Sequence, residues 1–383
     1  MRKLLTLLWL CLLGVAGLSG QPGGQAKPEQ AKPDQAKPDP DVLLFLDGER
    51  LTGHFVKSAG SSLTFHSDSL GDITVDWSKV KELQSSAKVA VIPKNAKLRR
   101  RADGSGIPQG TLSMQDQQVH LTAAPEPPKS IPVADAGQIV DQTGFQNALS
   151  HQPGLLDAWK GTVTIGAAVV NATQDSESFT GAVSLVRAIP TENWLEPSSR
   201  TSLNLAAAYG EVSQPSTPSI KTAIFHGDLE QDKYFSPRLY VFGQGALDHN
   251  FSQGLDLQQT YSGGLGWTLI QSDNETLDLK ASVSYIRQQF SGAPDLDLVG
   301  SVFGEAFRRK FKRGLVLNQH LTLVPVWNNT NAYSGIFSTL LTMPVYKRVN
   351  GSVGFIDSYL NNPPPAFRKN SLQLTLGLTY VLP

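Results

Sequence analysis

The chain has 383 residues, a formal net charge of zero and only 17% charged residues. This length exceeds the needs of one ordinary domain. The neutral balance removes the bulk electrostatic attraction on which nucleic-acid binding depends. After the first twenty residues no apolar run is long enough for a membrane-spanning helix, which needs about 20 such residues. A soluble all-β protein and a membrane β-barrel both fit this composition.

Residues 1–20 have the order of a secretory signal peptide. A basic start precedes an apolar core over 4–13 and then small residues, as in signals that are cleaved. We expect cleavage within 17–21. The single cysteine, Cys11, lies inside this segment, so the mature chain is expected to have no disulfide, thiolate metal ligand or cysteine nucleophile.

Two segments are predicted to be linkers. Residues 21–40 contain three copies of a pentapeptide, Gln-Ala-Lys-Pro followed by Glu or Asp. A proline every fifth residue, with nothing apolar to bury, predicts an extended tether. Residues 141–158 contain Pro and Gly and have no clear hydrophobic period, so we interpret them as a second linker.

Residues 41–140 predict a small all-β domain of two related halves, similar in outline to SH3-like or Sm-like folds. Asp-Gly at 47–48, between apolar runs, is a strong hairpin signal. The pattern that follows Gly53 is repeated in outline after Gly110. Five basic residues between 94 and 101 are interpreted as a solvated loop. The functional alternative for this loop is contact with an anionic envelope polymer or with lipid head groups.

From Trp159 onward, apolar and polar residues alternate strictly. Every even position of 371–382 is apolar, and so is every odd position of 276–285. Alternation over ten or more residues exceeds the five or six residues of an average strand. It matches the length that crosses a bilayer at a tilt. The same pattern in a soluble sandwich is the alternative.

Three further features favour a membrane barrel over 159–383. Aromatic residues lie near the strand ends, and the polar face consists mostly of small residues, as interfacial girdles and a lumen require. The connections alternate between tight turns, often basic, and longer segments rich in Asn, Ser, Pro and Gly. Counting both kinds predicts an antiparallel, up-and-down transmembrane β-barrel of about twelve strands.

The last strand, with Gly377 and Tyr380 at alternating positions, resembles the C-terminal signal by which the insertion machinery recognises outer-membrane barrels. It departs from that signal by ending on Leu382-Pro383. From the likeness of this strand to the signal we expect the insertion machinery to be a partner of the chain. From the barrel itself we expect outer-membrane lipids to be partners as well.

A family resemblance rests on Asp47-Gly-Glu-Arg-Leu-Thr-Gly53 and on Gly71-Asp-Ile-Thr-Val-Asp-Trp77. Trp159-Lys-Gly161 and the segment 233–240 fit the same pattern. These segments resemble a bacterial family of unknown function described as salt-induced outer-membrane proteins. The resemblance implies location and architecture, and it supplies no substrate, cofactor or catalytic residue.

Catalysis by a Ser/His site is the main alternative to a non-enzymatic role. The barrel segment contains the histidines His226, His249 and His320. His226 shares a strand face with Asp228 and Glu230, and His320 shares one with Asn318, but spacing of two places such pairs together in any strand. No Gly-x-Ser-x-Gly, His-Glu-x-x-His or P-loop pattern occurs in the mature chain.

We therefore predict a non-enzymatic protein of the bacterial outer membrane, with its N-terminal domain in the periplasm. It would be a small pore or a structural or stress-adaptive envelope component, monomeric, without catalytic, cofactor or metal-binding residues and without nucleic-acid partners. Asp278, Lys280, Asn318 and His320 are expected to pair into a plug or to line a narrow passage. An outer-membrane lipid hydrolase and a soluble secreted β adhesin are the alternatives.

Overall fold

The computed structural model describes residues 40–382 except for 102–103, 124, 152, 171–174 and 215–216. The predicted signal peptide, and the predicted first linker up to residue 39, lie outside the described residues. Within the described part, no helix is long and apolar enough to cross a membrane.

The first strands form one nine-stranded sheet, with order β4-β3-β2-β1-β5-β6-β7-β8 and with β9 pairing to β2 and β5. The strands are β1 (Asp41–Phe45), β2 (Arg50–Ala59), β3 (Ser62–Ser67), β4 (Gly71–Asp76), β5 (Val80–Pro93), β6 (Gln109–Gln115), β7 (Gln118–Ala123), β8 (Glu126–Pro132) and β9 (Ala136–Asp141).

The long strand β5 belongs to both halves of this sheet. Its first part pairs with β1 and its last part with β9, so that in each half a later strand returns beside an earlier one. Strands of the two halves also pair directly with each other. Ser58 of β2 lies opposite Ile139 of β9, and Glu82 of β5 lies opposite Gln115 of β6. One core of buried apolar residues serves both halves, including Leu43, Phe65, Leu83, Leu112 and Leu121.

Part of the predicted second linker is a helix, α2 (Gln142–Ser150). Its first turn is capped by Asp141, whose carboxylate accepts a hydrogen bond of 2.8 Å from the backbone N–H of Gly144. Phe145 and Leu149, one turn apart, are both buried. These two side chains are the only strongly apolar pair of the helix, which is why no clear period marks it.

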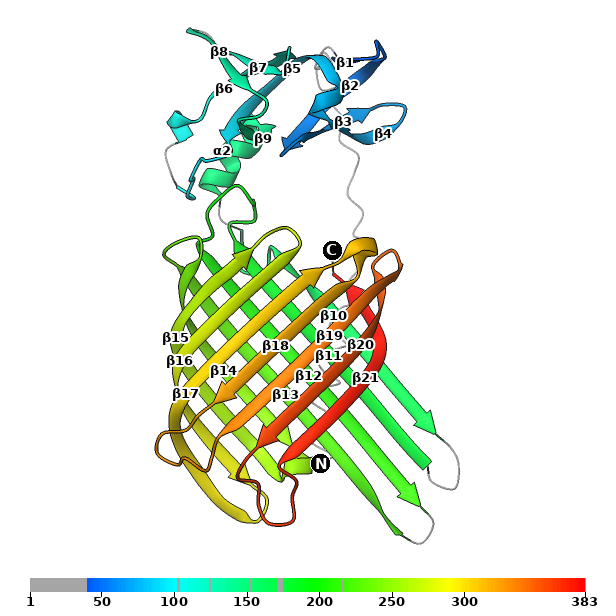
Figure 1. Ribbon diagram of the computed structural model, residues 1–383, viewed down its shortest axis with the longest axis vertical. Helices are drawn as coiled ribbons and strands as arrows, with labels where there is room; N and C mark the ends of the chain where they lie inside the picture. The colour runs from blue at the N-terminus through cyan, green and yellow to red at the C-terminus, as the bar shows by residue number, and fades with distance from the viewer. Residues whose placement is uncertain are drawn as a thin grey trace, which may run out of the picture. The chain divides into compact units, whose positions relative to one another are not determined.

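Residues 159–381 form a closed antiparallel barrel of twelve strands in sequential order (Figure 1). The strands are β10 (Trp159–Val170), β11 (Asp175–Ile189), β12 (Ser199–Gln214), β13 (Thr217–Tyr234), β14 (Leu239–Asn250), β15 (Leu255–Gln271), β16 (Glu275–Phe290), β17 (Ala293–Lys310), β18 (Val316–Val324), β19 (Ser334–Tyr346), β20 (Val349–Leu360) and β21 (Asn370–Val381). The all-β fold and the twelve-stranded up-and-down barrel are thereby confirmed.

Alternation along each strand separates an outer from an inner face. Leu376 and Leu374 of β21 are 68% and 66% exposed on the outside. On β16, Val283 is 55% exposed outward, whereas its neighbour Ser282 is buried and Lys280 points inward to an ion pair with β13. The barrel thus presents its apolar side chains outward and its polar side chains inward, the reverse of a soluble fold.

Candidate functional site in the barrel lumen

Ionisable and amide side chains converge on the inner face of strands β12 to β16. Their positions follow from the ladder register, which places them on the face opposite the exposed apolar residues. The cluster, called the lumen cluster below, comprises Arg200, Asn204, His226, Asp228, Glu230, Asp232, Asp248, Asp278 and Lys280.

Arg200 of β12 joins two aspartates across the lumen. Its Nε donates to Asp232 Oδ2 at 2.6 Å, and its Nη1 donates to Asp278 Oδ2 at 2.9 Å. Asp278 belongs to β16, four strands away from β12 around the barrel. Because Asp232 is fully buried, removing its cation would leave an uncompensated charge, which typically costs about 3–5 kcal/mol.

Two tyrosines support this guanidinium. The Arg200 Cζ lies 5.1 Å from the ring centre of Tyr240 and 5.9 Å from that of Tyr234. Tyr240 is fully buried because it lies over Gly266 of the next strand, where a Cβ would overlap the ring. The glycine-rich inner face of β15 therefore makes the room in which the arginine site is built.

A second ion pair joins Lys280 of β16 to Glu230 of β13. The Lys280 ammonium also lies 5.4 Å from the ring centre of Phe242. Since the Glu230 side chain is only 4% exposed, the pair is held away from bulk water and is weakly screened by salt.

His226 is bound on both ring nitrogens. Its Nδ1 lies 2.6 Å from Asp248 Oδ1, and its Nε2 lies 3.1 Å from Asp228 Oδ1. Asp228 also accepts a hydrogen bond from Asn204. A catalytic histidine needs one nitrogen facing its nucleophile, and both nitrogens of His226 face carboxylates.

The other predicted residues have separate fates. Asp278 and Lys280 are both inside the barrel, but each pairs with a different strand rather than with the other. His320 and Asn318 share the inner face of β18. His249 lies outside the lumen cluster, with its Nδ1 2.8 Å from the carbonyl oxygen of Asp256. Within the described residues, no cluster of His, Cys, Asp or Glu could hold a metal ion.

Sequence reasoning missed Arg200, Asp232 and Asp248. Arg200 is the second residue of β12, and a basic residue so near the end of a strand is ordinarily solvated. The sequence signal that could have identified Arg200 is its place in the alternation of β12, which assigns its side chain to the inner face. Nothing in the sequence indicates that its partner would be Asp278.

The opposite wall of the lumen carries small neutral side chains. Thr164 of β10 and Thr379 of β21 are hydrogen-bonded to each other at 2.8 Å. Gly166 and Gly377 lie on the same strands, where a Cβ would meet the neighbouring backbone. At mid-barrel, charge is thus concentrated on the wall of β12 to β16, while the inward residues named on β10 and β21 are small and neutral.

One side chain links opposite sides of the barrel at its long-loop end. Gln253, which follows β14, donates to the carbonyl oxygens of Ser358 at 3.1 Å and Lys369 at 2.8 Å. Five strands separate β14 from β20 in either direction, so this contact crosses the mouth. Gly254 has a φ of +65°, and a Cβ there would lie 2.9 Å from the Phe367 ring.

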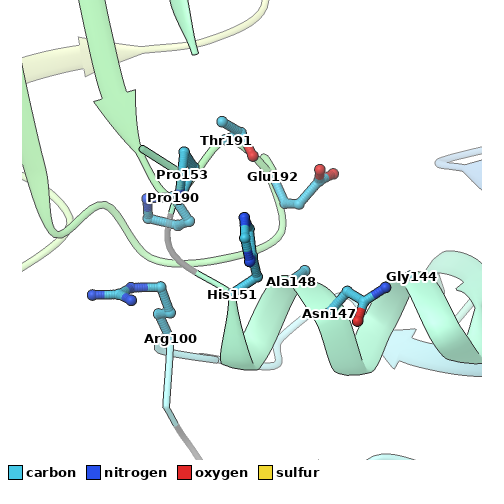
Figure 2. Close-up of a pocket in the computed structure, with 9 residues that line it drawn as sticks. All are labelled: Arg100, Gly144, Asn147, Ala148, His151, Pro153, Pro190, Thr191 and Glu192. Carbon is cyan, nitrogen blue, oxygen red and sulfur yellow. The ribbon is translucent and has the colours of Figure 1, made fainter. Parts of the chain in front are cut away.

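A separate hollow of about 450 Å³ lies between α2 and the turn after β11. Figure 2 shows Arg100 and His151 on one side and Glu192 on the other. Leu195 of that turn packs with Phe145 and Leu149 of the helix. The hollow is small and mixed in polarity, and it has none of the convergent hydrogen bonding of the lumen cluster.

The family model for DUF481, described as a protein of unknown function, matches residues 163–382. The chain belongs to this family. The matched region is the barrel, and residues 41–140 lie outside it. None of the curated proteins compared matches the chain.

Solved structures similar to this family member include three autotransporter domains, each 11% identical to the chain. The β domain of the Bordetella autotransporter BrkA has a TM-score of 0.28, with coverage of 59% of this chain and 98% of that one. The translocator domain of NalP from Neisseria meningitidis has a TM-score of 0.30, with coverage of 58% of this chain and 87% of that one. The transport unit of AIDA-I from Escherichia coli has a TM-score of 0.28, with coverage of 62% of this chain and 96% of that one. Similarity at this level carries no functional information.

Proposed function

We propose that this DUF481 protein is an integral barrel of the bacterial outer membrane. The observation that carries the proposal is the inverted polarity of the closed barrel. Outward residues such as Leu376, Leu374 and Val283 are more than half exposed, while buried carboxylates and cations face inward. In water such an outer face would be a large apolar patch that promotes aggregation, whereas in lipid it is satisfied.

The proposed orientation places the short turns and the N-terminal domain in the periplasm. Even strand number supports this, because β10 begins and β21 ends at the same side of the barrel. The signal-peptide order of residues 1–20 supports export. The stress-adaptive role implied by the salt-induced description of the resembling family remains a hypothesis beside this one.

Within the membrane, the proposed role is a narrow, cation-favouring passage that is closed in the conformation described. The lumen cluster has more carboxylates than permanent cations, so its net field attracts cations. The second oxygens of Asp232 and Asp278 are buried and have no hydrogen-bond partner among the described residues, so hydrogen bonds offset only part of the negative charge on these two carboxylates. The Gln253 contact is the proposed closure at the outer mouth.

The proposed role includes no catalysis. His226 supports this because both of its nitrogens bind aspartates. A lipid-release assay on the purified protein and on His226→Ala tests the point. Release of fatty acid by the parent protein that disappears in the variant would establish the lipid hydrolase instead.

Membrane insertion is tested on the mature full chain. Purified from membranes, it should need detergent to stay monodisperse and should migrate faster on a detergent gel before boiling than after it. A monomeric protein that is soluble without detergent and whose migration does not change on boiling would favour the secreted adhesin.

Conduction is tested in planar bilayers with the full chain. Gln253→Ala removes both cross-mouth hydrogen bonds and should raise the open probability. Gln289→Ala is the control, because this half-buried glutamine at the same end makes its side-chain hydrogen bond within the described residues to nearby Asp295. An absence of conductance in the parent and in Gln253→Ala alike would favour a structural role over a pore.

A further inference from the structure

Two neighbouring turns at the short-turn end of the barrel are strongly basic. The turn between β17 and β18 and the turn between β19 and β20 follow strands of one continuous ladder (Figure 1). They supply exposed basic side chains, called the basic rim below: Arg309, Lys310, Lys312, Arg313, Lys347 and Arg348.

The two turns lie against each other. Val316, just after the first turn, is opposite Thr342 in the β18–β19 ladder. Gly314 of the first turn packs so closely on the end of β19 that a Cβ at position 314 would lie 2.9 Å from Pro344 Cγ. The six cations therefore form one patch rather than two separate turns.

The patch is almost unneutralised. In the described part of the chain, the one ion pair of a basic-rim residue joins Arg309 to Glu275, at 4.0 Å. Cations at the opposite end are closer to acids, with Lys221 at 3.5 Å from Glu211 and Arg287 at 3.4 Å from Asp295. Like charges gathered without partners repel one another, which favours an anionic ligand.

Exposed aromatic rings hold two of these cations beside the apolar outer wall. Arg309 Cζ lies 5.3 Å from the ring centre of Phe311, and Lys347 Nζ lies 5.2 Å from that of Tyr346. Tyr346 is 65% exposed, and Val345 beside it is 64% exposed. Aromatic residues of this kind occupy the level of lipid head groups.

We propose that the basic rim is a binding site for an anionic phospholipid of the inner leaflet, whose phosphate lies among Lys312, Arg313, Lys347 and Arg348. The acyl chains would extend along the exposed side chains of Val345 and the outward residues above it. The basic rim is continuous with the apolar outer side chains above Val345. A lipid can contact both surfaces, whereas an anionic polymer would contact only the cations, so this arrangement favours a lipid. The inference rests on the proposed membrane location.

The test compares phosphatidylglycerol with phosphatidylcholine, each bound to the detergent-purified mature chain and counted by native mass spectrometry. Each removed charge should weaken binding to an anionic lipid about fivefold. At that rate the quadruple variant Lys312→Gln, Arg313→Gln, Lys347→Gln and Arg348→Gln should lose the preference for phosphatidylglycerol by roughly several hundredfold, and a loss of less than about tenfold would contradict the proposal. Val345→Ser should weaken retention of the long-chain lipid but not of its soluble short-chain form.

The matched control removes four cations from the other end: Lys221→Gln, Arg287→Gln, Arg368→Gln and Lys369→Gln. It should keep the preference. Equal loss in both variants, or no preference in the parent, would overturn the proposal, as would inorganic phosphate competing as well as the lipid. Heat-modifiable migration is recorded for every variant, so a failure of membrane insertion is distinguished from a failure of lipid binding. If the quadruple variant does not fold, the double variant Arg313→Gln and Lys347→Gln decides, with a tenfold or greater loss expected.

Discussion

Adjacent substitutions on β21 test which face of the barrel meets lipid. The strand has 12 residues, and at a tilt of about 40° each residue adds about 2.6 Å of height, so the strand rises about 31 Å. Leu376, the seventh residue, lies within about 2 Å of the middle. An arginine there should destabilise the barrel by about 2–4 kcal/mol, because its charge enters the centre of the hydrocarbon layer.

Thr375→Arg is the control at the same depth. Thr375 faces the lumen, where it makes only a weak hydrogen bond of 3.4 Å to Gly354. Losing this hydrogen bond lowers the unfolding free energy by about 0.5–1.5 kcal/mol. The guanidinium of the new arginine faces a lumen in which carboxylates outnumber permanent cations. Urea unfolding from lipid vesicles, followed by tryptophan fluorescence, gives both free energies. Equal losses at the two positions, or a larger loss at Thr375, would refute the assignment of faces.

Three further perturbations test the lumen and the N-terminal sheet. Gly266→Ala should destabilise the barrel by about 1–3 kcal/mol, because its Cβ would overlap a buried tyrosine ring, whereas Gly243→Ala, with open space around the Cβ, should change the unfolding free energy by less than about 0.5 kcal/mol. Lys280→Ala should leave Glu230 unpaired, which costs about 3–5 kcal/mol and shifts the reversal potential of any current toward cations, and Glu230→Gln in the same chain should reverse both effects. Backbone and side-chain hydrogen bonds lower the pKa of Asp76 below its usual 3.8, so its stabilisation is present above that value and lost as pH falls through the folded pKa. The difference in melting temperature between the parent and Asp76→Ala should therefore shrink between about pH 5 and pH 3, and a constant difference would contradict the assignment.

The barrel was predictable because its information is local. Alternation in 371–382 and in 276–285 assigns each side chain to a face without any knowledge of the partner strand. The helix at 142–150 escaped prediction for the opposite reason. Its cap and its one apolar pair are visible in the sequence, but nine residues with Gly144 near the start give a weak local signal.

Pairing inside the lumen could not be predicted from local sequence. Spacing of two groups His226 with Asp228, but other ion pairs join Arg200 to Asp278 and Lys280 to Glu230, residues many positions apart in the sequence. These partners meet only because the sheet closes on itself and bends β16 toward β12 and β13. Closure depends on strand number, tilt and stagger together, which no single segment of the sequence records.

The distribution of side-chain size around the barrel connects the cluster to the proposed passage. A barrel of twelve strands lies between small barrels filled by side chains and the open porins, so the lining decides whether space remains. Strands β12 to β16 fill their side with Tyr240, Arg200 and paired carboxylates, whereas β10 and β21 contribute residues such as Thr164, Gly166 and Gly377. A passage would therefore run along the small-residue wall with the charged wall beside it. In that arrangement the cluster can select ions by charge without its ion pairs having to break, and gating is left to the Gln253 contact at the mouth.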